Sequence, residues 1–127
     1  MIVREALVPD PRVLAADAPA REAAELLTHP HVLRALVTDG DHRLLGTVTV
    51  ESVVAAVARG TDMASATARD VCESDVFTVP PDMPLDEALH LMTERDLERL
   101  PVTENGHLLG ILPREPVVRR LAEDEAP

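Results

Sequence analysis

Aromatic side chains are almost missing from this sequence. Its 127 residues include one Phe and neither Trp nor Tyr, while hydrophobic residues make up 46% of the chain. The core must therefore be packed from aliphatic side chains. A chain of this length and apolar share suffices for one compact domain, or for two small halves that share a core.

Lysine is absent as well. All twelve basic residues are Arg, and 23 acidic residues leave a net charge of -11. A surface of this sign repels the phosphate backbone of nucleic acids and anionic lipids. We therefore expect neither a nucleic-acid partner nor a membrane partner, and we expect any anion site to depend on single Arg side chains and helix N-termini.

Cysteine and long hydrophobic runs are scarce too. Cys72 is the single cysteine and cannot form a disulfide within the chain, and we interpret it as a small core residue. The sequence shows no signal peptide and no apolar run approaching about 18 residues. These features predict a soluble, cytoplasmic protein.

Residue groups typical of catalysis or metal binding are also missing from the sequence. The segment His29-Pro30-His31 has no third ligand at a recognised spacing, so it indicates a helix end followed by a loop. The chain has neither a glycine-rich phosphate loop nor a nucleophile elbow. The sequence predicts no metal site, no required cofactor and no enzymatic activity.

What the chain does contain is an internal repeat. Shifted by 65 positions, the segment from Val3 to Thr38 matches the later sequence at eleven of its thirty-six positions. From Gly46 onward the shift becomes 64, because the earlier copy has one extra residue in a loop. Self-similarity of this kind predicts a fold unit that occurs twice. We expect repeat 1 to span residues 1–60 and repeat 2 to span residues 61–127.

Each repeat predicts the element order β-α-β-β-α. A helix opened by Pro19 or Pro84 carries apolar residues at i, i+3, i+4 and i+7, and a hairpin follows it. Asn105-Gly106 is a typical hairpin turn. The other expected segments are Val3–Leu7 and Thr67–Cys72 (short lead-in segments), Arg12–Ala15 and Val76–Val79 (extended), Asp39-Gly40-Asp41 (turn), Val50–Ala58 and Glu115–Ala122 (closing helices), and Ala122–Pro127 (acidic tail).

One such unit has too little core to stand alone. We therefore expect an α+β fold in which the two repeats are related by a pseudo-twofold axis and their sheets pack together.

The ordered motifs of the two repeats resemble the cystathionine β-synthase (CBS) domain, and the tandem resembles a Bateman module. The second repeat carries Glu87-Ala88, Leu100-Pro101-Val102 and Leu109-Gly110-Ile111-Leu112, and the weaker counterparts in the first are Glu22-Ala23, Leu36-Val37 and Leu45-Gly46-Thr47-Val48. The resemblance covers essentially the whole chain. It implies a stand-alone regulatory or sensor module without catalysis, which binds an adenosyl ligand such as AMP, ADP or ATP in the cleft between the repeats and pairs into a homodimer.

The resemblance also implies particular ligand-binding residues. The nucleotide motif of the family is Gly, two apolar residues, Thr or Ser, two variable residues and Asp. In the first repeat Thr49 matches, but Ser52 stands where Asp is expected. A serine can offer a ribose one weak hydrogen bond in place of a charged contact, which reduces affinity by about 1 to 3 kcal/mol.

In the second repeat Pro113 and Pro116 occupy both motif positions, which leaves Arg114 as the residue that could meet a phosphate. The family also places cleft-lining residues before the first hairpin strand and after the first extended segment. These positions correspond to Arg34, Arg99, Thr78 and Ala15.

Structural roles compete with each of these assignments. A Thr directly before a helix serves as an N-cap without any ligand. Arg34 and Arg99 could equally pair with acidic surface residues such as Glu98 and Asp96.

A second hypothesis is therefore a protein-interaction and dimerisation module whose ligand clefts have decayed. Its partner would be a separately encoded enzyme or transporter. The helices present more apolar residues than the module can cover internally, and we expect some of them to meet a twofold mate: Val53, Val54, Val57, Val117, Val118 and Leu121.

Overall fold

The chain divides into two compact units in the computed structural model, which describes residues 1–124. The first-repeat unit is Pro11–Val76. The second-repeat unit consists of Met1–Asp10 together with the chain from Phe77 onward. The compact units and the expected repeat boundaries, 1–60 and 61–127, thus differ at two places. The first ten residues fold with repeat 2, and residues 61–76 fold with repeat 1.

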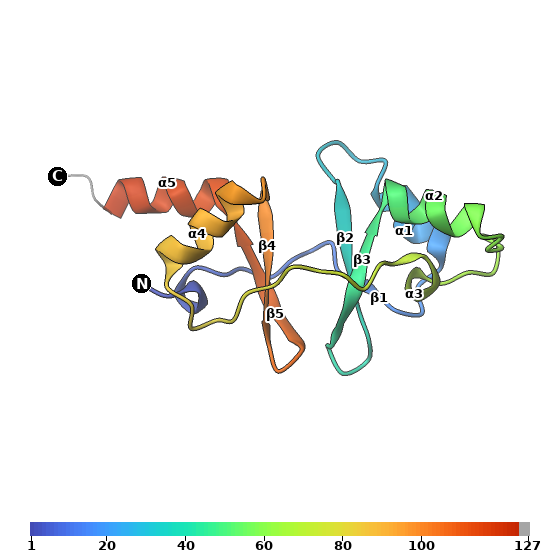
Figure 1. Ribbon diagram of the computed structural model, residues 1–127, viewed down its shortest axis with the longest axis horizontal. Coiled ribbons are helices and arrows are strands. Elements are labelled where there is room, and N and C mark those ends of the chain that lie inside the picture. Colours follow the sequence, from blue (N-terminus) through green and yellow to red (C-terminus); the bar gives the residue numbers. More distant parts are fainter. Residues whose placement is uncertain (125–127) are drawn as a thin grey trace. The chain divides into compact units, whose positions relative to one another are not determined.

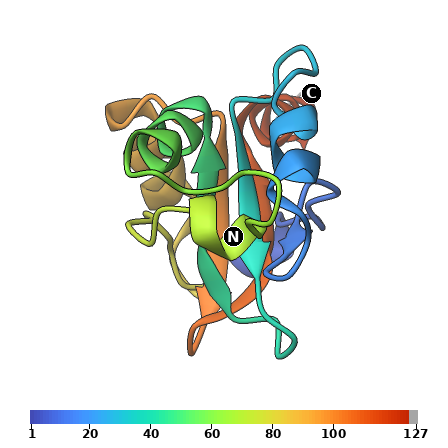
Figure 2. The same ribbon diagram turned by 90° about the vertical axis from the view of Figure 1, so that its right-hand side faces the viewer.

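The first-repeat unit is built on a three-stranded sheet in the order β1-β2-β3, with β1 parallel and β3 antiparallel to β2. Helices α1 and α2 lie over the same face of this sheet (Figures 1 and 2). The elements are β1 (Leu14–Ala15), α1 (Ala20–Leu26), β2 (Arg34–Thr38), β3 (Leu44–Thr49), α2 (Val50–Ala58) and α3 (Ala68–Val71).

The second-repeat unit repeats this plan around a two-stranded sheet, β4-β5. Its elements are η1 (Val3–Glu5), α4 (Leu85–Glu94), β4 (Arg99–Glu104), β5 (His107–Pro113) and α5 (Arg114–Asp124). The predicted extended segment Val76–Val79 is not a full strand here. Val79 alone forms a parallel bridge, to Val102. Pro80 and Pro81 follow it, and proline has no N–H to continue a ladder.

The α+β class is confirmed, and so is the repeated order of elements, apart from the first strand of repeat 2, which is reduced to the Val79 bridge; the pseudo-twofold relation of the sheets stays a prediction. Helix α5 runs through Asp124, so the predicted acidic tail begins too early, and its residues 125–127 lie outside the described part. In that described part, no helix combines the length and the apolar character needed to cross a membrane.

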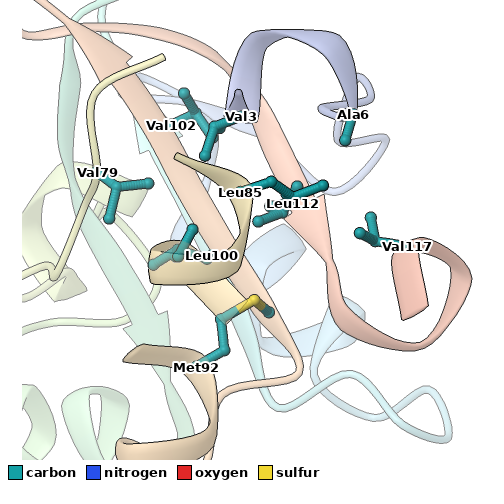
Figure 3. Close-up of a cluster of buried hydrophobic side chains, with 10 residues drawn as sticks. Val3, Ala6, Val79, Leu85, Met92, Leu100, Val102, Leu112 and Val117 are labelled. Carbon is teal, nitrogen blue, oxygen red and sulfur yellow. The ribbon is translucent and has the colours of Figure 1, made fainter. Parts of the chain in front are cut away.

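Each unit has its own aliphatic core. In the first-repeat unit small residues dominate, and Ala20 and Ala23 of α1 are fully buried against the sheet. In the second-repeat unit the equivalent helix uses larger side chains, with Leu85 and Met92 packed into the cluster that Figure 3 shows. The predicted apolar stripe of both first helices therefore faces a core, and no aromatic side chain is among the fully buried residues of either.

The two hairpins turn by different means. Asn105 and Gly106 have φ of 55° and 82°, as a two-residue turn requires. In the longer β2–β3 loop the carboxylate of Asp39 accepts hydrogen bonds from the backbone N–H groups of Asp41 and Arg43, both at 2.9 Å. Here His42, at φ 65°, takes the left-handed conformation.

Two glycines mark where another segment crosses each hairpin. Glu73 bridges β3 next to Gly46, and Val8 bridges β5 next to Gly110. A Cβ atom on Gly46 would lie 2.2 Å from the carbonyl oxygen of Glu73, and one on Gly110 would lie 2.5 Å from that of Val8. Real Cβ atoms do not approach backbone so closely, so both positions require glycine.

The apolar residues predicted on the helices are covered only in part within the units. Val117 belongs to the core of the second-repeat unit with 4% of its surface exposed, because this side of α5 faces β5. Val53 and Leu121 are half-buried against the cores. The large apolar residues that remain exposed on these helices are Val50, Val54 and Val57 of α2 and Val118 of α5.

Candidate functional site

Arg34 and Thr49 form the centre of the candidate site. They are direct partners in the β2–β3 ladder, at the end of the hairpin where β3 passes into α2. The Arg34 side chain is exposed and forms no salt bridge with any described residue. The residue with this free guanidinium is thus the cross-strand neighbour of the N-cap of α2, where the helix dipole and the first N–H groups favour an anion.

Thr49 and Ser52 cap helix α2 reciprocally. The Thr49 Oγ1 accepts from the Ser52 backbone N–H at 3.0 Å, and the Ser52 Oγ accepts from the Thr49 N–H at 2.8 Å. The Ser52 hydroxyl also donates to the Thr49 carbonyl at 3.0 Å, and the residue is 2% exposed. The only proton of the Ser52 hydroxyl is thus already used, so Ser52 acts within the cap.

The Thr49 hydroxyl differs from that of Ser52 in one respect. It accepts a hydrogen bond in the cap, but it donates to no described residue. Thr49 is half-buried, so its proton is available to a ligand without disrupting the cap. Capping and ligand binding are therefore compatible at this residue.

The predicted residues of the second repeat are partnered. Arg99 of β4 pairs with Asp10 at 3.3 Å, and that carboxylate side chain is 6% exposed. Arg114 lies 3.8 Å from the carboxylate of Glu98, and its backbone N–H donates to the Glu98 carbonyl. The expected partners of Arg99 were Glu98 and Asp96, and the structure pairs it with Asp10 because residues 1–10 fold into the second-repeat unit.

Ala15 and Thr78 lie away from these groups within their own units. Ala15 pairs with Thr38, at the turn end of the β2–β3 hairpin. Thr38 and Arg34 are four positions apart along β2, which is about 13 Å at the rise of an extended strand. The Thr78 hydroxyl accepts from the Thr103 hydroxyl at 3.2 Å. The structure therefore groups Arg34 and Thr49, but not Ala15, at the α2 end of the sheet.

Cys72 lies partly buried beside the first-repeat core. Its thiol donates to the Arg69 carbonyl at 3.3 Å, and burial raises the pKa of the thiol above its ordinary value. A raised pKa disfavours the nucleophilic thiolate. The interpretation of Cys72 as a packing residue is consistent with this environment.

The comparison with protein families supports the repeat directly. The model of the CBS domain family matches the chain twice, at residues 3–59 and 68–123. The chain belongs to the CBS domain family. Both matches contain one hairpin and the helices on either side of it, so this CBS pair holds two copies of the family unit.

Curated relatives of the CBS pair cover it to different extents. An uncharacterized protein of Methanopyrus kandleri is 34% identical over 68 residues, which are 53% of this chain and 35% of the relative. Hypoxic response protein 1 of Mycobacterium tuberculosis is 31% identical over 103 residues, 80% of this chain and 72% of the relative. The chain thus spans about a third of the first relative and most of the second.

Among solved structures, that of CBSX2 in complex with AMP has a TM-score of 0.74 and 25% sequence identity to this chain. The match covers 98% of each chain. The similarity therefore extends over both repeats.

Proposed function

We propose that this CBS pair is a regulatory module that binds an adenosyl ligand, AMP or a related nucleotide, without catalysing a reaction. The observation that carries the proposal is the position of Arg34, which forms no salt bridge with a described residue, directly across the β-ladder from Thr49 at the N-terminus of α2. A phosphate at this point would meet a guanidinium, a free hydroxyl proton and helix N–H groups. The AMP complex of CBSX2 supports the choice of ligand class.

The position of Ser52 sets the expected affinity. Because its hydroxyl is held in the α2 cap, it is a poor partner for the two ribose hydroxyls. We therefore expect the phosphate contact at Arg34 to contribute more to binding than the ribose contact does. Ligands with a phosphate, such as AMP, ADP and ATP, should bind more tightly than adenosine.

Calorimetric titration of the full chain with AMP, ADP, ATP, NAD and S-adenosylmethionine tests this proposal. Arg34→Gln should weaken the binding of phosphate-bearing ligands about tenfold, since a charge-assisted hydrogen bond contributes about 1.5 kcal/mol or more. Arg59→Gln is the matched control, because Arg59 is an exposed arginine of the same unit at the other end of α2. Equal binding by the two variants would contradict the site. If none of the five ligands produced binding heat or raised the thermal stability, that result would contradict the function.

Two substitutions of Ser52 separate its two roles. Ser52→Asp retains an acceptor for the cap and adds the carboxylate of the family motif, so AMP binding should tighten by about 1 to 3 kcal/mol. Ser52→Ala should lower the free energy of unfolding by about 1 kcal/mol through loss of the cap and leave AMP affinity unchanged. Weaker AMP binding in folded Ser52→Ala would instead show that the serine hydroxyl contacts the nucleotide.

The second candidate function is a protein-interaction and dimerisation module. It is favoured by the apolar face of α2, where Val50, Val54 and Val57 are each more than half exposed at spacings of four and three residues. Such a face is typical of an interface in a folded protein. A second copy of the chain would cover it, and a separately encoded enzyme or transporter would be the partner of the resulting dimer.

Sedimentation at micromolar concentration tests the second function. We expect a dimer that Val54→Asp converts to a monomer, because an interface that buries this helix face would have to bury the new charge. Leu33→Asp is the matched control, since Leu33 is 73% exposed but lies outside the helices. A monomeric wild-type chain would contradict this function. A dimer that binds none of the five ligands would favour it over the first.

A further inference from the structure

A second candidate site lies at the turn end of the β2–β3 hairpin, away from Arg34 and Thr49. An open cavity of about 740 Å³ occurs there, beside the loop that joins β2 to β3 at the bottom of Figure 1. Its polar lining includes Thr38 at the end of β2, His42 of the loop and Arg69 of α3. This turn-end cavity is of the size that small-molecule sites have in proteins.

Thr38 presents an unused hydroxyl to the turn-end cavity. The residue is 5% exposed, and its side chain has no hydrogen-bond partner among the described residues. No fully buried side-chain oxygen or nitrogen in the described chain lacks a partner, so the Thr38 hydroxyl is reached from outside the protein. A nearly buried hydroxyl that is open only toward a cavity is a group for which a ligand can supply the missing hydrogen bond.

In the second repeat, the hydroxyl equivalent to that of Thr38 already has a hydrogen-bond partner. Thr38 corresponds to Thr103, whose hydroxyl donates to Thr78 at 3.2 Å. The residue equivalent to Thr78 in the first repeat is Val13, which has no hydroxyl. The substitution of valine for threonine leaves the Thr38 hydroxyl unpaired.

Among the described residues, the first repeat also lacks a salt bridge that the second-repeat unit forms at the equivalent place. Arg69 corresponds to Arg4, which forms a salt bridge of 3.0 Å with Glu104. The counterpart of Glu104 is Asp39, which is one methylene shorter. Arg69 makes no salt bridge with any described residue, so its guanidinium stays available on the wall of the turn-end cavity.

The loop of the first hairpin engages the Asp39 carboxylate, which forms no salt bridge with Arg69. One oxygen of its carboxylate accepts from the N–H groups of Asp41 and Arg43. The hydrogen bond from the Arg43 N–H, followed by that from Asp41, lowers the pKa of Asp39 and keeps the carboxylate charged, and the charge of Arg69 contributes to this lowering. Asp17 adds a second acidic group to the lining. The cavity therefore offers one cationic and two anionic side chains.

These charges select the class of ligand. A phosphate dianion would meet two carboxylates, and a simple cation would leave Arg69 without a partner. We propose that the turn-end cavity binds a small zwitterion, a free α-amino acid, with its carboxylate at Arg69 and Thr38 and its ammonium group at Asp17 and Asp39. The site is independent of the Arg34–Thr49 site, so either could fail without the other.

Amide chemical shifts of the full chain test the proposal. Each standard α-amino acid is added alone at concentrations up to about 10 mM, above a Kd of about 1 mM. We expect at least one of them to shift the amide resonances of Gly40 and His42, while leaving Val50 and Glu51 at the start of α2 unchanged. Acetate and methylammonium, which carry one charged group each, should shift the same amides at least about tenfold less at equal concentration.

Three variants assign the groups. Arg69→Gln and Asp17→Asn should each weaken binding about tenfold by removing one charged contact. Thr38→Val keeps the shape of the side chain, removes no internal hydrogen bond and should weaken binding several-fold. Arg59→Gln is the control and should bind as the wild type does. Absence of any shift at Gly40, equal shifts with acetate, or unchanged binding in Arg69→Gln would each overturn the proposal.

Discussion

Gly46 and Gly110 hold equivalent places in the two repeats, and each lies where a separate stretch of backbone passes the hairpin. The equivalence extends to the residues that approach them, because Glu73 and Val8 are related by the 65-position shift of the repeat. Identity between repeats could mark these glycines as special from sequence alone. Which segment approaches them depends on tertiary packing, so the sequence analysis could not name it.

Gly46→Ala should lower the free energy of unfolding by about 1 to 3 kcal/mol, as overpacked positions do. The new Cβ would displace Glu73, whose backbone exchanges hydrogen bonds of 2.9 and 2.8 Å with Thr47. Chemical denaturation measures the loss. Gly40→Ala is the control, because nothing lies within 4 Å of a Cβ at Gly40. Equal stability of the two variants would contradict the close approach.

Asp70 makes the folding stability of the protein depend on pH. Its carboxylate accepts from the Thr67 backbone N–H at 2.9 Å and from the Thr67 hydroxyl, and these bonds lower its pKa below the ordinary 3.8. The stabilisation is therefore complete above pH 3.8 and is lost as pH falls through the lowered folded-state pKa.

Asp70→Asn should consequently lose less stability than the wild type on acidification from about pH 5 to pH 2. Thermal unfolding at a series of pH values measures the difference. Above about pH 5 the gap between the two proteins should be constant, because the carboxylate is ionised in both the folded and the unfolded state. Parallel curves over the whole range would show that Asp70 does not titrate differently on folding.

At the scale of elements, the sequence predicted the helices and turns that depend on interactions between neighbouring residues. Helix α2 runs from Val50 to Ala58 as expected, and Thr49 caps it. Asn105-Gly106 forms the predicted turn. The register of β1 was not predictable, because a two-residue strand takes its place from the neighbouring β2. Ala15 pairs with Thr38, at the opposite end of β2 from Arg34.

The end of α2 provides a test at the same scale. Gly60 follows the helix with φ 91° and has open space where a Cβ would stand. Gly60→Ala should therefore cost about 1 kcal/mol through backbone conformation alone. Gly40→Ala, at a glycine without positive φ and with the same open space, should cost less. Equal effects in denaturant titrations would argue against a left-handed end to α2.

For the whole molecule, the sequence predicted two copies of one unit but not the exchange of their leading segments. A repeat in sequence states the order of elements, and it does not state which copy a lead-in segment packs with. Val3 and Ala6 are buried in the core of the second-repeat unit, although in sequence they belong to the first repeat. The same exchange supplies Asp10 to Arg99.

Val3→Ala tests the exchange by hydrogen exchange of backbone amides. The substitution removes two methyl groups from a fully buried side chain, which costs about 1 to 2.5 kcal/mol. Protection should fall in β4 and β5, with the amides of β2 and β3 affected less, because Val3 packs with the second-repeat core. A loss confined to β2 and β3 would contradict the placement of residues 1–10.

The displaced lead-in segment also has a consequence during synthesis. A ribosome completes Pro11–Val76 before it has synthesised most of the chain from Phe77 onward, so the first-repeat unit can fold while residues 1–10 still lack the segment they pack with. Val3 and Ala6 remain exposed to water throughout that interval. The speed of translation beyond Val76 would then set how long the apolar residues Val3 and Ala6 stay accessible to chaperones.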